Sequence, residues 1–270
     1  MILNILISTL NNRILGLKNI ITNDENIIYT ISHQVMEELN TETMKYIQTL
    51  CSSNNIIYSK IHSQGVAINR NNALKHRIKG SICLLSDDDV IYFKGSFKQI
   101  IQEFKEDNNL EFLTFKIKTF SGKDYKNYKA HEFKHTLKSL SIIGIVDVAF
   151  KEEMIEKYSL RFDERFGPGG EYCIGEDFIF MTDAIKKKAN ILYKPIDIVQ
   201  HEDIGTGMVL RDDIIFGRGA MFARVFGKLS FMINIYFAIK NRKKYKSKYT
   251  FWEYNILLFQ GNRDYVRKIS

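Results

Sequence analysis

Residues Ile82 to Val90 read Ile-Cys-Leu-Leu-Ser-Asp-Asp-Asp-Val, an apolar run that ends in three consecutive carboxylates. A short continuous apolar run is typical of a strand buried on both faces, as in a parallel sheet. Adjacent like charges repel, so Asp87, Asp88 and Asp89 need solvent, a cation or protein donors to compensate them. The stretch predicts a buried strand whose carboxyl end carries either a cation site or a solvated acidic turn.

Around this stretch, short β-branched runs alternate with segments of helical spacing. The predicted strands are Ile2–Ser8, Asn26–Ser32, Asn55–Lys60 and Ser81–Ser86, and the predicted helices are Ile14–Ile20, Thr41–Leu50 and Val66–Arg77. Further strands are expected at Glu111–Lys118 and Ile142–Phe150, a polar segment at Ser121–His135, an irregular loop at Phe162–Gly175 and a helix at Asp177–Lys188. The alternation predicts an α/β fold, a mostly parallel sheet flanked by helices.

Polar residues follow three of the predicted strands. They are Thr9-Leu10-Asn11-Asn12-Arg13 after the first strand, His33-Gln34 after the second and Asp87-Asp88-Asp89 after the fourth. In open α/β sheets the ligand binds beyond the carboxyl ends of the strands. We therefore expect these side chains to share one edge of the sheet.

Composition indicates a folded protein with an uneven charge distribution. The chain has 270 residues, 45% hydrophobic and 26% charged, with a formal net charge of +8. Residues 225–270 hold ten Lys and Arg against two Asp and Glu, which leaves 29 basic and 29 acidic residues in the rest of the chain. This pattern predicts a neutral body and a basic tail, and we expect the division to fall between a domain at 1–205 and a helical C-terminal extension at 206–270.

The cysteines and the N-terminus favour the cytoplasm. Three widely spaced cysteines, without a Cys-x-x-Cys pair, suggest neither a disulfide framework nor a zinc site. The apolar start Met1–Ile7 lacks a basic leader and is interrupted by Asn4, so we interpret it as a strand and not as a signal peptide.

A second cluster lies at residues 166–177, where four glycines and a proline precede Glu176 and Asp177. Glycines let the backbone approach a ligand closely, and acidic side chains are favourable at the start of a helix. Taken alone, the cluster also fits a surface loop that leads into a capped helix. His201 follows another short strand and is a candidate imidazole ligand, although most single histidines are ordinary polar residues. Arg70, near the start of a predicted helix, suits a base or phosphate contact.

The C-terminal tail combines an apolar run with a basic one. Residues 229–239 are almost entirely apolar, and six Lys and Arg follow between Lys240 and Lys248. The run is shorter than the about 20 residues that span a bilayer. Two alternatives remain: a peripheral contact with an anionic membrane through 226–248, on its cytoplasmic face, or a core helix with a solvated basic end.

Taken in order, these segments resemble glycosyltransferase family 2 and its GT-A fold, from the first strand to about His201. The matching stretches are Ser8–Arg13, Gly65–Ala73, Leu85–Asp89, Phe162–Gly167 and Gly175–Asp177, which look like the family's nucleotide-binding opening, Arg-Asn segment, Asp-x-Asp strand end, Phe-Asp-Glu-x-Phe-Gly element and Gly-Glu-Asp element. The chain departs from the family where His33-Gln34 replaces an Asp after the second strand, and where Ser8 and Leu10 replace Pro and Tyr of the opening.

The resemblance implies an inverting enzyme of surface-polysaccharide assembly. It would transfer a sugar from a nucleotide-sugar, most commonly a UDP-sugar in this family, to a hydroxyl of a glycan or lipid-linked glycan. Asp177 would be the general base, with support from Glu176, and Mn²⁺ or Mg²⁺ would be held by Asp89, Asp87 and His201. The implied nucleotide-sugar contacts are Thr9, Leu10, Asn12, Arg13, His33, Gln34, Arg70, Asp87 and Asp88.

Other classes of protein stay open. A non-catalytic nucleotide- or glycan-binding protein on the same fold would keep the carboxylates without turnover. The basic tail alone suggests a nucleic-acid-binding module, but this leaves both acidic clusters unexplained, so no nucleic-acid partner is expected. A phosphatase with an Asp-x-Asp nucleophile would need a further acidic metal site and a phosphate-binding Lys or Thr, which are not evident.

Overall fold

The computed structural model describes residues 1–202 and 210–269, which form two compact units. Among these residues, the first unit comprises 1–64, 68–162 and 180–202, and the second comprises 65–67, 163–179 and 210–269. The domain boundary expected after residue 205 lies outside the described residues, so the division into 1–205 and 206–270 stays a prediction. The loop at 163–179 is grouped with the C-terminal helices rather than with the sheet.

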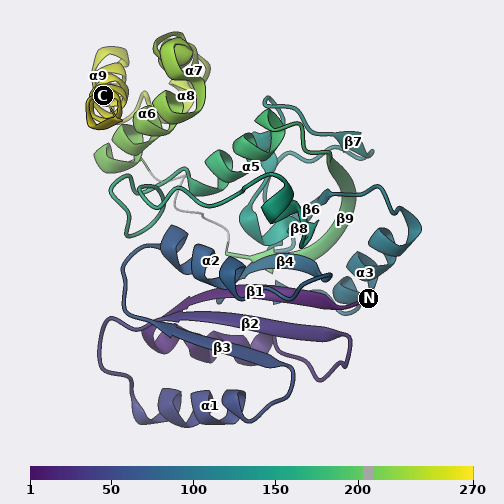
Figure 1. Cartoon of the computed structure of the whole chain (residues 1–270). Helices are drawn as coiled ribbons and strands as arrows, with labels where there is room; N and C mark the ends of the chain where they lie inside the picture. Colours follow the sequence, from purple (N-terminus) through teal and green to yellow (C-terminus); the bar gives the residue numbers. More distant parts are fainter. Residues whose placement is uncertain (203–209, 270) are drawn as a thin grey trace. The chain divides into compact units, whose positions relative to one another are not determined.

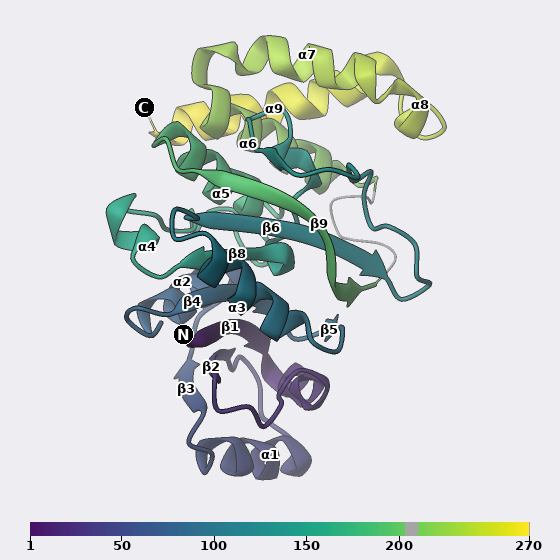
Figure 2. The same cartoon turned by 90° about the vertical axis from the view of Figure 1, so that its right-hand side faces the viewer.

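The first unit is built on a single sheet (Figure 1). Its strands are β1 (Leu3–Leu10), β2 (Ile27–Gln34), β3 (Ile56–Ile61), β4 (Ile82–Asp87), β5 (Ile91–Tyr92), β6 (Phe112–Thr119), β7 (Phe133–Lys134), β8 (Val148–Lys151) and β9 (Ile191–His201). Their order is β3-β2-β1-β4-β8-β6-β9-β5, with β7 paired to β9. Strands β1 to β4 run parallel to one another, β8 is antiparallel to both β4 and β6, and β6 runs parallel to β9 (Figure 2). The predicted α/β class is confirmed.

Helices connect the strands of the first unit. They are the 3-10 helix η1 (Asn11–Asn19), α1 (Thr41–Cys51), α2 (Val66–Lys75), α3 (Ser96–Glu106), the 3-10 turns η2 (Leu140–Ile142) and η3 (Ile145–Asp147), α4 (Met154–Lys157) and α5 (Glu176–Lys186). Helix α1 begins after Asn40, whose side chain accepts a hydrogen bond from the Thr43 amide at 2.8 Å. The strand predicted at Ile142–Phe150 was right only at its end, because 3-10 turns occupy its first part and β8 begins at Val148.

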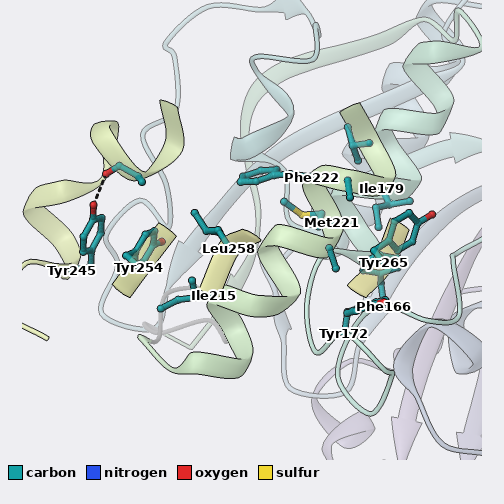
Figure 3. Packing of buried hydrophobic residues seen from close by; sticks show 14 residues of the cluster. Phe166, Tyr172, Ile179, Ile215, Met221, Phe222, Tyr245, Tyr254, Leu258 and Tyr265 are labelled. Carbon is teal, nitrogen blue, oxygen red and sulfur yellow. Dashed lines mark hydrogen bonds between the residues drawn. The ribbon is translucent and has the colours of Figure 1, made fainter. Parts of the chain in front are cut away.

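The second unit is helical and has an aromatic core. Its helices are α6 (Asp212–Phe226), the 3-10 turn η5 (Gly227–Leu229), α7 (Ser230–Lys240), α8 (Arg242–Tyr245) and α9 (Phe251–Ile269). Figure 3 shows Phe166, Tyr172 and Tyr265 together at one end of this core and Tyr245 beside Tyr254 at the other. The rings of Tyr245 and Tyr254 stack at 3.8 Å, and the Tyr245 hydroxyl donates to the Ala238 carbonyl at 2.9 Å.

Helices α6 and α9 cross with their backbones in contact. A Cβ atom added at Gly219 would lie 1.9 Å from the Leu258 carbonyl oxygen. One added at Gly261 would lie 1.9 Å from the carbonyl oxygen of Phe216. Real carbon and oxygen atoms do not approach so closely, so the crossing requires glycine on both helices.

Buried His135 makes the stability of the first unit pH-dependent. Its ring nitrogens lie 2.8 Å from Thr114 Oγ1 and 2.9 Å from Ser139 Oγ, and burial lowers its pKa to about 4. Because the pKa is about 6.5 in the unfolded chain, the contribution of neutral His135 is fully present above pH 6.5 and is lost as the pH falls toward 4. At pH 5 the expected loss is about 2 kcal/mol of unfolding free energy.

We expect the His135→Gln variant to be less stable than the parent at pH 7 but to lose less stability between pH 7 and pH 5. Gln keeps hydrogen-bonding capacity without a titrating group. Urea unfolding of both proteins at the two pH values measures the difference. Equal losses in parent and variant would contradict this role of His135.

Candidate active site

Three of the predicted segments meet at one edge of the sheet, as expected. In the parallel register Ser8 of β1 is opposite Asp87 of β4, and Thr9 and Leu10 are opposite His33 and Gln34 of β2. The loop that begins at Asn11 leaves β1 through η1, and Asn11 itself takes a left-handed conformation with φ of 48°. The carboxyl ends of β1, β2 and β4 therefore bring together the polar residues that the sequence singled out.

Protein donors compensate most of the charge of the acidic triplet. Arg70 donates to Asp87, with Nη2 3.0 Å from Oδ1. Buried Asp88 accepts from Thr9 Oγ1 at 2.7 Å and from Arg13 Nε at 3.0 Å. Arg13 also contacts Asp89, with Nη2 2.8 Å from Oδ2. Burial raises the pKa of Asp88 to about 6, although Arg13 and Thr9 both favour its ionised form.

One carboxylate oxygen of the triplet differs from the others. Asp89 Oδ1 is buried and accepts no hydrogen bond from residues 1–202 or 210–269. It lies 3.6 Å from Nε2 of His201, which comes from the end of β9. The pairing of β5 with β9 places Ile91 opposite Gln200 and so brings the two side chains together. The predicted association of His201 with Asp89 is thus present in the fold, while its role as a ligand stays a prediction.

Asp89 and His201 together offer two ligands to a cation, a carboxylate oxygen and an imidazole nitrogen. Within residues 1–202 and 210–269, no group of three or more His, Cys, Asp or Glu side chains is arranged to hold a metal ion. Mg²⁺ and Mn²⁺ sites commonly take one or two protein ligands and complete their coordination with phosphate and water. The arrangement therefore suits a cation that binds together with a phosphorylated ligand.

Three further candidate residues at this edge of the sheet form hydrogen bonds within the protein. His33 is buried, with Nδ1 2.8 Å from the Tyr58 hydroxyl and Nε2 2.8 Å from the Asn11 carbonyl, so both ring nitrogens already have partners in the protein. Burial lowers the pKa of His33, so its ring is neutral at pH 7. Gln34 is buried and donates to Ser63 Oγ at 3.2 Å. Asn12 accepts from the Asn40 amide at 3.1 Å.

Leu10 and Arg70 lie in contrasting environments. Leu10 is exposed at the end of β1, where an apolar side chain can contact a flat ligand such as a base. Arg70 is buried on α2, and its guanidinium lies 5.6 Å from the centre of the Phe162 ring. Cation–π packing and the ion pair with Asp87 together fix the position of Arg70.

The glycine-rich loop of the second unit has a backbone that other residues could not adopt. Gly167 has φ of +96°, and a Cβ there would lie 2.7 Å from Val66 Cγ1 and 2.8 Å from the carboxyl carbon of Glu176. The Val66 amide donates to the Pro168 carbonyl at 2.9 Å. Glu176 is buried where α5 begins, and Asp177 follows it half-buried. The loop therefore fixes the position of the predicted catalytic pair.

Asp163 holds this loop against the C-terminal helices. It accepts from Arg165 Nε at 2.9 Å and from Arg224 Nε of α6 at 3.0 Å. Burial would raise the pKa of Asp163, but the two arginines outweigh it and lower the pKa. Tyr172 reaches α9, where its hydroxyl donates to Asp264 at 2.9 Å. Asp163, the aspartate of the Phe-Asp-Glu stretch, therefore has a structural function.

Several residues that organise the site carried no separate sequence signal. Asn69 donates from Nδ2 to the Thr9 carbonyl at 2.9 Å, and a Cβ at Gly16 would lie 2.2 Å from the Asp88 carbonyl oxygen. The Tyr125 ring lies 5.6 Å from that of His201. A glycine inside a predicted helix, such as Gly16, is the one signal of a close backbone approach that the sequence offers for these residues.

Comparison with solved structures identifies the fold. The chain aligns with S. aureus TarS 1-349 with a TM-score of 0.65, at 14% identity, over 100% of this chain and 83% of that one. The chain shares the GT-A-like fold of this structure. The complex of TarS 1-349 with UDP aligns with a TM-score of 0.63, at 14% identity, over 93% of this chain and 76% of that one. A longer TarS chain aligns with a TM-score of 0.61, at 14% identity, over 91% of this chain and 44% of that one.

Sequence comparison adds no closer relationship. No protein-family model matches the chain, and no curated protein matches it. The likeness to TarS therefore establishes the fold. The chain spans less than half of the longer TarS structure, and the activity has to be argued from the residues of the site.

Proposed function

We propose that this protein is an inverting, metal-dependent glycosyltransferase that moves a sugar from a UDP-sugar to a hydroxyl of a glycan or lipid-linked glycan. The observation that carries the proposal is Asp89 Oδ1, a buried carboxylate oxygen that lies 3.6 Å from His201 Nε2 and has no hydrogen-bond donor in the part of the chain that the structure describes. A buried anionic oxygen is costly to leave unpaired, so this atom favours a cation. TarS, which shares the fold, has been crystallised with UDP, and this supports the donor class.

Mn²⁺ fits the side chains at this position better than Mg²⁺. Carboxylate oxygens suit both ions, whereas an imidazole nitrogen is a ligand for transition metals. Asp89 and His201 would hold the ion, and Asp87 would be a further carboxylate ligand. When bound, such an ion supplies positive charge to the nucleotide diphosphate as it departs.

The loop after β1 and the start of α2 would bind the nucleotide. Asp88 keeps Thr9 and Arg13 together, so its role in our proposal is to position the loop that faces the donor. Arg13 is more than half exposed, which leaves its guanidinium able to contact a phosphate while Asp88 anchors it. Leu10 and Gln34 would lie against the base. Arg70 would keep Asp87 in a position to accept a hydrogen bond from the ribose.

Asp177 would act as the general base on the acceptor hydroxyl. A carboxylate is far too weak a base to ionise an alcohol before the reaction, so the proton moves as the oxygen attacks the anomeric carbon. A single displacement of this kind inverts the configuration. Glu176, buried beside Gly167, would keep the first turn of α5 in place.

The cysteines are consistent with a cytoplasmic enzyme. Cys51, Cys83 and Cys173 are all free, as expected in a reducing compartment. Nucleotide-sugars of the proposed class would be available to the protein there.

Thermal-shift titration tests the proposed donor without an acceptor. UDP, GDP, CDP and ADP are added in turn with Mn²⁺ or with a chelator. We expect UDP with Mn²⁺ to stabilise the protein by about 2.7 kcal/mol at a hundred times its dissociation constant, a shift of roughly 5 °C or more. The same UDP concentration with chelator should give a smaller shift. The absence of a response to every nucleotide would contradict the proposal.

A further inference from the structure

Helices α7 and α9 expose large apolar side chains to solvent. Seven of these side chains between residues 229 and 256 are each more than half exposed: Leu229, Phe231, Met232, Tyr236, Ile239, Trp252 and Ile256. Single exposed apolar residues are ordinary, but a cluster of this size on two packed helices marks a contact surface. We name these seven residues the outer apolar face.

The outer apolar face is continuous across the two helices. Leu229, Met232, Tyr236 and Ile239 follow one another at three- and four-residue steps, which places them along one side of α7 and its preceding turn. The opposite side, with Asn234 and Ala238, is fully buried. On α9, Trp252, Ile256 and Phe259 share a side in the same way, and the Phe259 ring lies 4.8 Å from that of Phe231.

A basic cluster lies directly beside this face in the chain. Lys240 ends α7, and α8 and the turn after it contribute Arg242, Lys243, Lys244 and Lys246, all exposed. Among the ion pairs of residues 1–202 and 210–269, none involves these five side chains. No Asp or Glu occurs between residues 214 and 252. The cluster therefore keeps its full positive charge beside an apolar surface.

The same region contains a stretch long and apolar enough to cross a membrane. By length and composition, residues Asp212–Lys240 fit a membrane span, with 33% of the most apolar window buried. In the fold, however, α6 ends at Phe226, and Gly227 turns the chain with φ of 53°. The Phe222 and Phe237 rings meet at 5.2 Å, so α7 packs against α6. Neither helix alone has the about 20 residues that a span needs.

A second copy of the chain would fit this surface less well than a membrane. A symmetric dimer joins the same patch on both subunits, so its two basic clusters would be brought toward each other. Juxtaposed like charges oppose such an association. An anionic lipid leaflet offers the opposite charge to the basic cluster and an apolar interior to Met232, Ile239 and Trp252.

We propose that the outer apolar face and the basic cluster bind the surface of an anionic lipid bilayer. Tyr236 and Trp252 lie at the level of the headgroups, which aromatic residues with one polar atom prefer. Lys243, Lys244 and Lys246 lie against the lipid phosphates. This binding does not depend on sugar transfer, so it can fail while the proposed activity holds.

Trp252 makes the binding directly measurable, because it is the chain's single tryptophan and is 74% exposed. The full chain is titrated with vesicles of phosphatidylcholine alone or with 30% phosphatidylglycerol. We expect a blue shift of the emission with the anionic vesicles, quenching by lipids brominated in their acyl chains, and weaker binding at high salt. With phosphatidylcholine alone the shift should be much smaller. An unchanged spectrum with anionic vesicles would overturn the proposal.

Two variants and a matched control separate the parts of the surface. Replacing Lys243, Lys244 and Lys246 by Gln should weaken partitioning about a hundredfold, from roughly fivefold for each charge. The double variant Met232→Ser, Ile239→Ser should also weaken partitioning onto the vesicles, but its dependence on salt should stay unchanged. The control replaces Lys45, Lys98 and Lys105, exposed lysines of the first unit, by Gln and should bind nearly as the parent does. Equal losses in the control would point to net charge alone and would overturn the assignment.

The oligomeric state of the protein in solution tests the alternative that a second copy of the chain covers the outer apolar face. Sedimentation of the parent without lipid should give a monomer whose Trp252 emission does not depend on protein concentration. A stable dimer that the Met232→Ser, Ile239→Ser variant dissociates would assign the outer apolar face to a second copy of the chain and would contradict membrane binding.

Discussion

Asp177→Asn is expected to bind UDP and Mn²⁺ as the parent protein does and to lose sugar transfer by about 10²- to 10⁴-fold. Asparagine has nearly the same shape as aspartate but cannot accept a proton from the acceptor hydroxyl. It also keeps hydrogen-bonding capacity at the start of α5, so the glycine-rich loop should stay in place. UDP release from UDP-sugars, with short oligosaccharides as acceptors, measures the transfer. Thermal shift with UDP and Mn²⁺ measures donor binding on the same samples.

A neighbouring carboxylate supplies the control for Asp177. Glu171 belongs to the same loop and pairs with Lys268 at the surface, outside the predicted catalytic pair. Glu171→Gln changes the charge of the loop by the same amount and should retain transfer. Near-normal turnover by the Asp177→Asn variant, or an equal loss in the control, would contradict the role of Asp177 as general base.

Asp89→Asn should abolish the part of UDP binding that depends on Mn²⁺ and reduce transfer by at least about 10²-fold. The neutral amide is a much weaker ligand for a divalent cation than the carboxylate oxygen beside His201. Binding of UDP in the presence of chelator should change little, because Thr9 and Arg13 keep their hydrogen bonds to Asp88. Thermal shift with and without Mn²⁺ separates the two contributions.

His201 and a distant acid complete this test. His201→Gln should lower the Mn²⁺-dependent stabilisation less than Asp89→Asn, by about ten- to a hundredfold in metal affinity. Glu106→Gln removes an exposed carboxylate of α3 and should leave Mn²⁺ binding unchanged. If the Asp89→Asn variant responds to Mn²⁺ as the parent does, the cation is bound elsewhere.

The strands and their polar ends were predictable because each has a local cause. A short apolar run such as Ile82–Leu85 is typical of a strand buried on both faces, and parallel strands bring their carboxyl ends to one edge. The meeting of Thr9, His33 and Asp87 followed from that rule alone. The GT-A fold was expected from the ordered series of motifs, and the solved structures confirm it.

The partners of the charged residues were not predictable, because they depend on contacts distant in the chain. Nothing near Asp88 indicates that Arg13 would hold it, and nothing near Asp163 points to Arg224. Similarly, the sequence could not separate an acidic turn from a cation site. The hydrogen-bond pattern distinguishes the three carboxylates: it occupies Asp87 and Asp88 and leaves one oxygen of Asp89.

The glycine contact between α6 and α9 gives the second unit a mechanical property. At Gly219 and Gly261 the two backbones approach so closely that a side chain at either position would force the helices apart. Helix α9 carries Trp252 near one end and, near the other, Asp264 and Tyr265, which hydrogen-bond to Tyr172 and Arg165 of the glycine-rich loop. Helix α9 therefore connects Trp252 to the glycine-rich loop. The proposed contact of Trp252 with a lipid surface would therefore hold the loop that leads to Asp177 at a fixed height above that surface.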